Sequence, residues 1–353
     1  MSTSNKPVPR RSARGSSAGD ERTGPVTLQQ VAERAGVSPS TVSRILNGTA
    51  VVSDDKKKAV DDAIKELGFV PNPVARGLAG GRTLSVGVVT QAIDSPFYGG
   101  AHRGIEDTLL PAGYSPLFIS GHWDDTAEAR CIEVLRSRRV DGLIVLTGRM
   151  DDEALKGLAR QLPIVVTGRD LSAPGVYSLN FDDLHGARLA TEHLLSLGHK
   201  RIAFIGGDPL HPDSGKREQG YREALQAHGV AVDEALLQEG NYQEESGLQA
   251  IERLLASGVP FTAIFAANDQ MAFGAALALH RRGLRVPHDV SLVGFDDVAT
   301  SSFTVPPLSS VHQPVYELGR LAATAMLDLL AGRQPEAALP APHIVVREST
   351  AAI

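Results

Sequence analysis

From Leu84 onward, short apolar runs rich in β-branched residues alternate with longer amphipathic segments, and this alternation constrains the fold most. The apolar runs are LSVGVV, PLFIS, DGLIVL, PIVVTG, KRIAFIG, FTAIFAA and DVSLVGF. Apolar strands that alternate with helices of about 10 to 15 residues are typical of parallel sheets covered on both faces. Because these units are too many for one ordinary sheet, we predict an α/β core of two doubly wound lobes. Ligands bind such folds beyond the carboxyl ends of the strands.

The remaining bulk features restrict the class of protein. The 353 residues suit two or three domains, and the only cysteine, Cys131, lies in a helical pattern that predicts a core position. A disulfide framework is therefore excluded, and we expect no metal site and no cofactor. No apolar run approaches the roughly 20 residues of a membrane span, and residues 1–24 lack the apolar stretch of a secretory signal. We therefore expect a cytoplasmic protein without a membrane partner.

Charge is distributed unevenly along the chain. Residues 1–82 carry 13 Lys and Arg against 8 Asp and Glu, whereas the remaining residues carry 22 against 33. A basic front end on an acidic body favours a polyanionic partner at that end. Residues 1–24, rich in Ser, Gly, Pro and Arg, are expected to form a disordered basic tail, whose arginines either contact phosphates or are simply solvated.

The segment TLQQVAERAGVSPSTVSRILNG predicts two short helices joined by a tight turn. Thr27 and Gln30 have the spacing of a capping box, which begins the first helix. Gly36 falls at the turn, where a left-handed backbone is costly for other residues. Ser38 then caps a second helix that has Pro39 at its first position. Helix, glycine-containing turn and helix form the helix-turn-helix unit of DNA-binding domains.

The second of these helices is the one expected in the major groove. Its first turn exposes Pro39 and Ser40, and Arg44 follows one turn later on the same side. Arg44 can donate two hydrogen bonds to a guanine edge, which discriminates by about 1–3 kcal/mol. Phosphate contacts, which fix register without selecting bases, are expected from Thr27, Thr41, Ser43 and Asn47. The alternative is a helical hairpin with no nucleic-acid partner.

A third helix and a hinge complete the front end. The pattern SDDKKKAVDDAIKELG predicts a helix capped by Ser53, closing a domain over residues 25–70. Residues 71–82, PNPVARGLAGGR, allow only a short helix, which is marginal in water unless it binds something. An exposed Leu78 beside Ala79 and Arg76 suits a wedge inserted into the minor groove. The alternative is an interdomain linker whose leucine packs on the core.

Together, VTLQQVAERAGVSPSTVSRILNG and GFVPNPVARGLAGGRT closely resemble the lac repressor family, including its purine and gluconate-type repressors. The resemblance continues through SPFYGGAHRGIED, FAANDQMAFGAALAL, RVPHDVSLVGFDD and IVVREST, and covers about residues 25–350. It implies an all-α helix-turn-helix headpiece on a two-lobed, periplasmic-binding-protein-like α/β core over 83–353. The implied N-lobe comprises 83–181 and 309–331, and the implied C-lobe comprises 182–308 and 332–353.

The resemblance also implies roles for individual residues. Pro39, Ser40 and Arg44 occupy base-contacting positions, and Leu78 with Ala79 matches the pair inserted at the centre of the operator. The effector contacts that it implies are Phe97, Tyr98, Asp213, Arg217, Tyr242, Asn268, Asp296 and Gln313. Flat aromatic faces suit the apolar side of a sugar ring, while Asp, Asn and Arg bind hydroxyls. The alternatives are that Asp296 caps a turn and Phe97 belongs to the core.

We therefore expect a transcriptional repressor, not an enzyme, that binds a palindromic DNA operator under the control of a small carbohydrate effector. A homodimer is expected, because the chain ends soon after REST without a leucine-heptad tail. A solute-binding protein of a sugar transport system is one alternative, which the headpiece disfavours. An enzyme is another, but FIGGD and GLAGGRT are not phosphate loops, and His199, His211 and His228 lack metal-ligand spacing.

Overall fold

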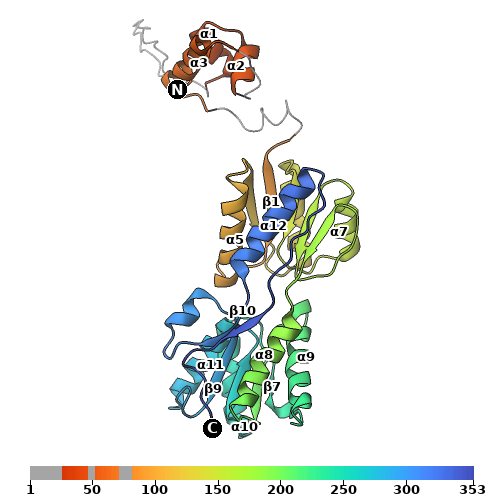
Figure 1. The fold of residues 1–353 in the computed structure, drawn as a ribbon, viewed down its shortest axis with the longest axis vertical. Helices are drawn as coiled ribbons and strands as arrows, with labels where there is room; N and C mark the ends of the chain where they lie inside the picture. The colour runs from red at the N-terminus through yellow and green to blue at the C-terminus, as the bar shows by residue number, and fades with distance from the viewer. Residues whose placement is uncertain (1–25, 47–51, 71–81) are drawn as a thin grey trace, which may run out of the picture. The chain divides into compact units, whose positions relative to one another are not determined.

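The computed structural model describes residues 26–46, 52–70 and 82–353, and it divides the chain into two compact units, 1–81 and 82–353 (Figure 1). Each unit has a hydrophobic core of its own. The expected basic tail, Asn47 and the hinge residues Arg76, Leu78 and Ala79 lie outside the described residues.

The first unit is a three-helix domain. Its helices are α1 (Leu28–Ala35), α2 (Pro39–Leu46) and α3 (Asp54–Leu67). The side chains at its centre are Val31, Ala32, Val42, Val60 and Ala63. All three helices contribute to this small core, which confirms the predicted helix-turn-helix and the third helix behind it.

Local sequence signals explain where these helices begin and end. The capping box is present, since the Thr27 hydroxyl accepts from the Gln30 amide and the Gln30 side chain accepts from the Thr27 amide. Gly36 ends α1 with φ of 67°, the left-handed conformation that favours glycine. Ser53 stands at the N-cap of α3, but its side chain makes no capping hydrogen bond. The expected cap at Ser53 was therefore correct in position and wrong in mechanism.

The first lobe of the core is built on a parallel five-stranded sheet in the order β2-β1-β3-β4-β5. This is a common doubly wound order. Its strands are β1 (Ser85–Thr90), β2 (Ser115–Ser120), β3 (Gly142–Val145), β4 (Ile164–Thr167) and β5 (Val176–Leu179). Its helices are α5 (Pro96–Leu109), α6 (Asp125–Ser137), α7 (Asp152–Ala159) and, from much later in the chain, α12 (Val315–Leu330).

The second lobe has a six-stranded sheet in the order β11-β10-β9-β8-β6-β7. Its strands are β6 (Ile202–Ile205), β7 (Leu237–Gln238), β8 (Ala263–Ala266), β9 (Ser291–Asp296), β10 (Ser309–His312) and β11 (His343–Val345). Its helices are α8 (Asp183–Ser196), α9 (Pro212–Ala227), α10 (Glu244–Ser257) and α11 (Asp269–Arg281), with short 3-10 turns η1 (Glu234–Leu236) and η2 (Ala299–Phe303). All pairs are parallel except β10 with the edge strand β11. The two doubly wound lobes are thus confirmed.

One expected boundary is wrong. Residues 309–312 were assigned to the first lobe, but they form β10, which pairs with β9 in the second sheet. The chain returns to the first lobe only after this strand, as α12. Ser309 and Ser310 are polar yet fully buried, so the apolar signal of a central strand was missing from the sequence.

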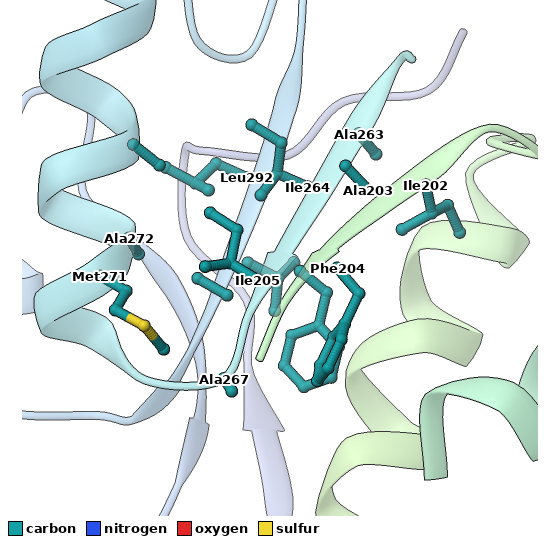
Figure 2. Close-up of a cluster of buried hydrophobic side chains, with 14 of the residues drawn as sticks. Ile202, Ala203, Phe204, Ile205, Ala263, Ile264, Ala267, Met271, Ala272 and Leu292 are labelled. Atoms are coloured by element: carbon teal, nitrogen blue, oxygen red, sulfur yellow. The ribbon is translucent and has the colours of Figure 1, made fainter. Parts of the chain in front are cut away.

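The core of the second lobe shows why its strands are continuously apolar. Figure 2 shows side chains of β6 and β8 gathered with Met271 and Ala272 of α11. Strands β6, β8 and β9 are buried on both faces, so their positions are small or apolar except for Asp296 at the end of β9. No helix within residues 26–46, 52–70 or 82–353 is both long and apolar enough to cross a bilayer.

In the first lobe, α5 and α12 lie side by side although they are far apart in sequence (Figure 1). Glycines allow this close approach. A Cβ atom on Gly104 of α5 would lie 2.1 Å from the carbonyl oxygen of Tyr316, and one on Gly319 of α12 would lie 2.0 Å from that of Ala101. The backbones therefore touch where the helices cross.

We predict that Gly319→Ala destabilises the core. The added methyl would overlap backbone, so the helices must separate, and we expect the free energy of unfolding to fall by about 1–3 kcal/mol in chemical denaturation. Gly99→Ala on α5 is the control, because no atom lies within 4 Å of its Cβ position. Equal stabilities of the two variants would contradict this account of the crossing.

Candidate functional site

A cavity lies in the core, at the carboxyl ends of strands from both sheets. Its lining residues from the first lobe are Ala92, Ser95, Phe97, Tyr98, Trp123 and Thr147. Those from the second lobe are His211, Asp213, Arg217, Tyr242, Gln243, Asn268, Gln270 and Asp296. The position matches the general rule for ligand sites in doubly wound folds.

The structure brings together the residues expected to contact an effector. All of them line this cavity except Gln313, whose side-chain oxygen instead accepts from Arg217 at 3.4 Å. They come from separate segments: Phe97 and Tyr98 from the first turn of α5, Tyr242 from the loop after β7, and Asp296 from the end of β9. Their side chains meet only because parallel strands end at the same edge of each sheet.

Arg217 on α9 is the electrostatic centre of the cavity wall. Its Nε and Nη2 both lie 2.9 Å from Asp183 Oδ1. Its Nη1 donates to the Ala267 carbonyl and lies 3.5 Å from Asp296 Oδ1. Its Cζ lies 3.8 Å from the centroid of the Phe295 ring. Burial is the largest single effect and disfavours its charge, but Asp183, Tyr242, Asp296 and Asp213 together outweigh it and hold the pKa of Arg217 above its usual value. The guanidinium therefore stays ionised, with acceptors from four segments of the second lobe.

Three acceptors in the same wall are left open. Asp213 Oδ1, Asp296 Oδ1 and the Tyr242 hydroxyl are buried, and none has a hydrogen-bond partner in the described part of the chain. Burial also raises the pKa of Asp296 well above its usual range. Unpartnered buried polar atoms are costly, so their concentration here indicates that the cavity binds a polar molecule.

Aromatic rings from both lobes also line the cavity. Trp123 of the first lobe stacks on His211 of the second, with ring centroids 3.4 Å apart, and His211 stacks in turn on Tyr242 at 5.0 Å. Tyr98 lies 6.4 Å from Trp123 and meets Phe97 edge-to-face at 5.2 Å. A sugar ring or another flat apolar face can pack on such surfaces.

The sequence predicted no role for Gln91. Gln91 is fully buried; its side-chain oxygen accepts from the Trp123 amide at 2.9 Å, and its amide donates to the Thr147 carbonyl at 3.0 Å. His122 and Trp123 both adopt positive φ, of 52° and 57°. Positive φ is unfavourable for residues other than glycine, and the hydrogen bond to Gln91 stabilises the loop in this conformation.

The motif FIGGD, which is not a phosphate loop, has a steric explanation. A Cβ atom on Gly207 would lie 2.0 Å from Cζ of Tyr242, so the tyrosine ring occupies the space that a side chain would need. The glycine lets Tyr242 lie flat against the backbone that follows β6.

Contacts across the cleft connect the two lobes. Arg149 Nη2 donates to Asp208 Oδ2 at 2.6 Å, and the Ser95 hydroxyl donates to the Gln270 side chain at 3.2 Å. Buried Glu128 accepts from the amides of Arg149 and Met150, which fixes the loop that carries the arginine. Closure of the lobes is therefore coupled to the geometry of the cavity between them.

The headpiece presents its own candidate interface. Pro39, Ser40 and Arg44 are exposed on α2, opposite the buried Val42. The Ser40 and Thr41 hydroxyls both hydrogen-bond to the Ser38 hydroxyl at 2.8 Å. Thr27 is exposed at the start of α1, and Ser43 is half-buried. A face of small and cationic side chains without large apolar residues suits a DNA groove.

Within the described segments, no group of three or more His, Cys, Asp or Glu side chains could hold an ion. The HPD sequence at 211–213, a weak signal for a metal or a ligand, contributes His211 and Asp213 to the cavity.

Comparison with known proteins adds independent evidence. Residues 27–72 match the family model for bacterial regulatory proteins of the lacI family, and residues 191–350 match a periplasmic binding protein-like domain. The HTH-type transcriptional regulator DegA of Bacillus subtilis (strain 168) is 36% identical, with 92% of this chain and 98% of DegA covered. A solved complex of the transcriptional regulator CelR with cellobiose is 36% identical, with a TM-score of 0.69 and coverage of 92% of this chain and 99% of that chain. The lac repressor dimer bound to operator and the anti-inducer ONPF is 33% identical, with a TM-score of 0.84 and coverage of 93% and 100%.

We predict that Gly207→Ala displaces the Tyr242 ring and thereby disturbs the stack with His211 and Trp123. Because Trp123 is the only tryptophan of the chain, its emission spectrum should shift in the ligand-free protein. Gly215→Ala on α9, with open space at its Cβ position, should leave the spectrum as in the parent. Identical spectra for all three proteins would show that Gly207 does not place the ring.

We predict that His211 makes folding sensitive to acid. Burial lowers its pKa to about 4, whereas an unfolded histidine has a pKa of about 6.5. Between these values the unfolded chain binds a proton that the folded chain does not, so stability falls as pH drops. Relative to His211→Gln, the parent should lose on the order of 2 kcal/mol between pH 7 and pH 5 in chemical denaturation. His288→Gln, at an exposed position, serves as the control and should retain the parent's pH dependence.

Proposed function

The chain belongs to the lacI family of bacterial regulatory proteins, and on that premise we propose that it is a transcriptional repressor controlled by a small carbohydrate. The observation that carries the proposal is the presence in one chain of a helix-turn-helix headpiece and a two-lobed core with a polar, aromatic cavity. We assign this action to the cytoplasm, where the DNA partner is found.

The proposed operator is a palindromic duplex bound by a homodimer. A two-fold protein matches a two-fold site, and the solved lac repressor is described as a dimer bound to its operator. In our proposal Arg44 contacts a guanine edge, Pro39 and Ser40 contact neighbouring bases, and Thr27, Thr41 and Ser43 contact phosphates. The roles of Asn47, Arg76, Leu78 and Ala79 remain predictions, because these residues lie outside the described segments.

The proposed effector site is the cavity between the lobes. Phe97, Tyr98, Tyr242 and Trp123 would pack on the apolar face of a sugar ring, and Asp213, Asn268 and Asp296 would bind its hydroxyls. Arg217, which also lines the cavity, would contribute a cationic contact to the effector, and Gln313 would act from behind by accepting from Arg217. The solved CelR complex contains cellobiose, which supports a carbohydrate as the class of ligand.

Effector and operator are coupled by linkage. A ligand that binds the closed lobes more tightly than the open lobes shifts the protein toward the closed state, by at most the ratio of its two affinities. If the closed and open states also differ in operator affinity, effector and operator change each other's affinity by the same factor. In this proposal, the Arg149–Asp208 and Ser95–Gln270 contacts across the cleft are present when the lobes are closed and are lost when they open. We propose that closure is transmitted through the dimer to the two hinge segments.

The transport alternative is less well supported. The second lobe matches a periplasmic binding protein-like domain, but the DNA-binding headpiece has no use in a solute-binding protein. The named relatives are regulators matched along nearly their whole length, which likewise favours regulation over an enzyme.

We predict that Arg44→Ala weakens binding to the preferred duplex by about 1–3 kcal/mol, roughly 5- to 150-fold, and relaxes base preference at one position of each half-site. The preferred duplex can be selected from a random pool and the affinity measured by gel shift at fixed salt. Lys65→Ala, the same change in charge on the exposed face of α3, is the control and should stay near the parent. A folded Arg44→Ala variant that binds as tightly as the parent would contradict the assigned interface.

A further inference from the structure

We propose that His312 and His343 form a binding site for a divalent transition-metal ion where the chain crosses between the two lobes. The chain leaves the second lobe directly after His312, at the end of β10, and returns to it at His343, the first residue of β11. The sequence predicted no metal site, because the whole of α12 separates the two histidines along the chain and hides their proximity. The site is independent of the proposed function, since neither an effector nor DNA takes part in it.

Strand pairing places the two histidines side by side. In the antiparallel ladder of β10 and β11, His312 is directly opposite His343. Residues opposite each other in such a ladder project from the same face of the sheet, with Cβ atoms about 4.5–5.5 Å apart. The centroids of the two imidazole rings lie 4.9 Å apart, at an interplanar angle of 41°. Two metal–nitrogen bonds of about 2.0–2.1 Å at a near-tetrahedral angle separate imidazole centroids by roughly 5 Å, so the pair can share one ion without movement of the backbone.

Asp297 orients the ring of His312 for this role. His312 Nδ1 lies 2.9 Å from Asp297 Oδ2, and because a carboxylate only accepts, Nδ1 carries the proton and donates. The Nε2 atom of the neutral ring then has a free lone pair, which is what a metal requires. Arg347 Nη2 donates to the other carboxylate oxygen, Oδ1, at 2.6 Å and so holds Asp297 in place. A carboxylate behind a histidine is the usual arrangement in metal sites, where it fixes the tautomer and makes the ligand more basic.

The chemistry of the pair selects the class of ion. Imidazole nitrogen suits Zn²⁺, Ni²⁺ and Cu²⁺, whereas Mg²⁺ and Ca²⁺ prefer oxygen ligands. His343 is exposed and the His312 side chain is 36% exposed, so solvent reaches the site and water can complete the coordination. A structural zinc site takes four protein ligands, and a site with two therefore suits an exchangeable ion.

A bound ion would join the two strands that carry the chain between the lobes. β10 leads into α12 of the first lobe, and β11 is the three-residue strand that follows the return. β11 lies at the edge of its sheet and pairs only with β10. A metal bond between His312 and His343 would tie the first residue of this short strand to its neighbour, so local opening of the strand should become rarer.

The site is tested by calorimetric titration of the full-length protein with Zn²⁺ and with Ni²⁺, with Mg²⁺ as the ion that prefers oxygen. We expect Zn²⁺ and Ni²⁺ to bind, and we expect the affinity to fall at least about tenfold in His312→Gln and in His343→Gln, since each removes one of two protein ligands. His288→Gln, at another exposed histidine, is the control and should bind as the parent does. A parent that binds neither ion, a His343→Gln variant that binds as tightly as the parent, or equally tight binding of Mg²⁺ overturns the site.

The role of Asp297 is tested with the same titration. Asp297→Asn should weaken Zn²⁺ binding about 10- to 100-fold, as expected when the orienting carboxylate is lost. Asp297→Glu restores a carboxylate and should recover part of the affinity, whereas Glu133→Gln, the same charge change as Asp297→Asn at an exposed site on α6, should match the parent. Parental affinity in Asp297→Asn, or an equal loss in the Asn and Glu variants, would show that Asp297 does not position His312.

The link between the strands is tested by hydrogen exchange. Saturating Zn²⁺ should slow amide exchange in β11 of the parent and of His288→Gln, and it should leave exchange in β11 of His343→Gln unchanged. His343 is exposed, so this variant is expected to fold, and parental operator binding would confirm it. Zn²⁺ binding without slower exchange in β11 would contradict an ion shared between the two strands.

Discussion

The buried guanidinium of Arg217 is the interaction on which the second lobe and its cavity depend. A cation that is 3% exposed must be neutralised and fully hydrogen-bonded, or its burial would cost several kcal/mol. The partners that satisfy it come from α8, from the end of β8, from the end of β9 and from the residue after β10. One charge therefore fixes the start of α8 and the carboxyl ends of β8, β9 and β10 relative to one another, which places Asp296 at the cavity surface.

The cavity is a joint product of both lobes. The first contributes Tyr98 and Trp123, the second contributes His211 and Tyr242, and the rings meet only where the lobes face each other. Any change in lobe separation must break the stack of Trp123 on His211, together with the Arg149–Asp208 pair. Ligand binding and lobe closure are thus the same event described from two sides, which is the physical requirement for an effector that acts at a distance.

Much of the fold could be predicted from the sequence, for identifiable reasons. The first headpiece helix begins and ends at residues that the sequence identifies: Thr27 and Gln30 form the predicted capping box, and Gly36 ends the helix. The long apolar strands were also evident. Strands β5, β7, β10 and β11 were not, because they are short or polar, and β10 is held by pairing with β9 rather than by its own apolar character. That is why the expected lobe boundary at residue 309 was wrong.

The candidate site likewise has features that the sequence predicts and features that appear only in the folded chain. The helix-turn-helix, the alternation that requires two doubly wound lobes and, through resemblance, half of the residues that line the cavity were readable from the chain alone, because local signals and motif order carry that information. The pairing of Arg217 with Asp183, the hydrogen bond from the Trp123 amide to Gln91, and the room that Gly207 leaves for Tyr242 became visible only in the folded chain. These depend on which atoms meet across segments distant in the chain, and no local pattern encodes the pairing of a particular donor with a particular acceptor.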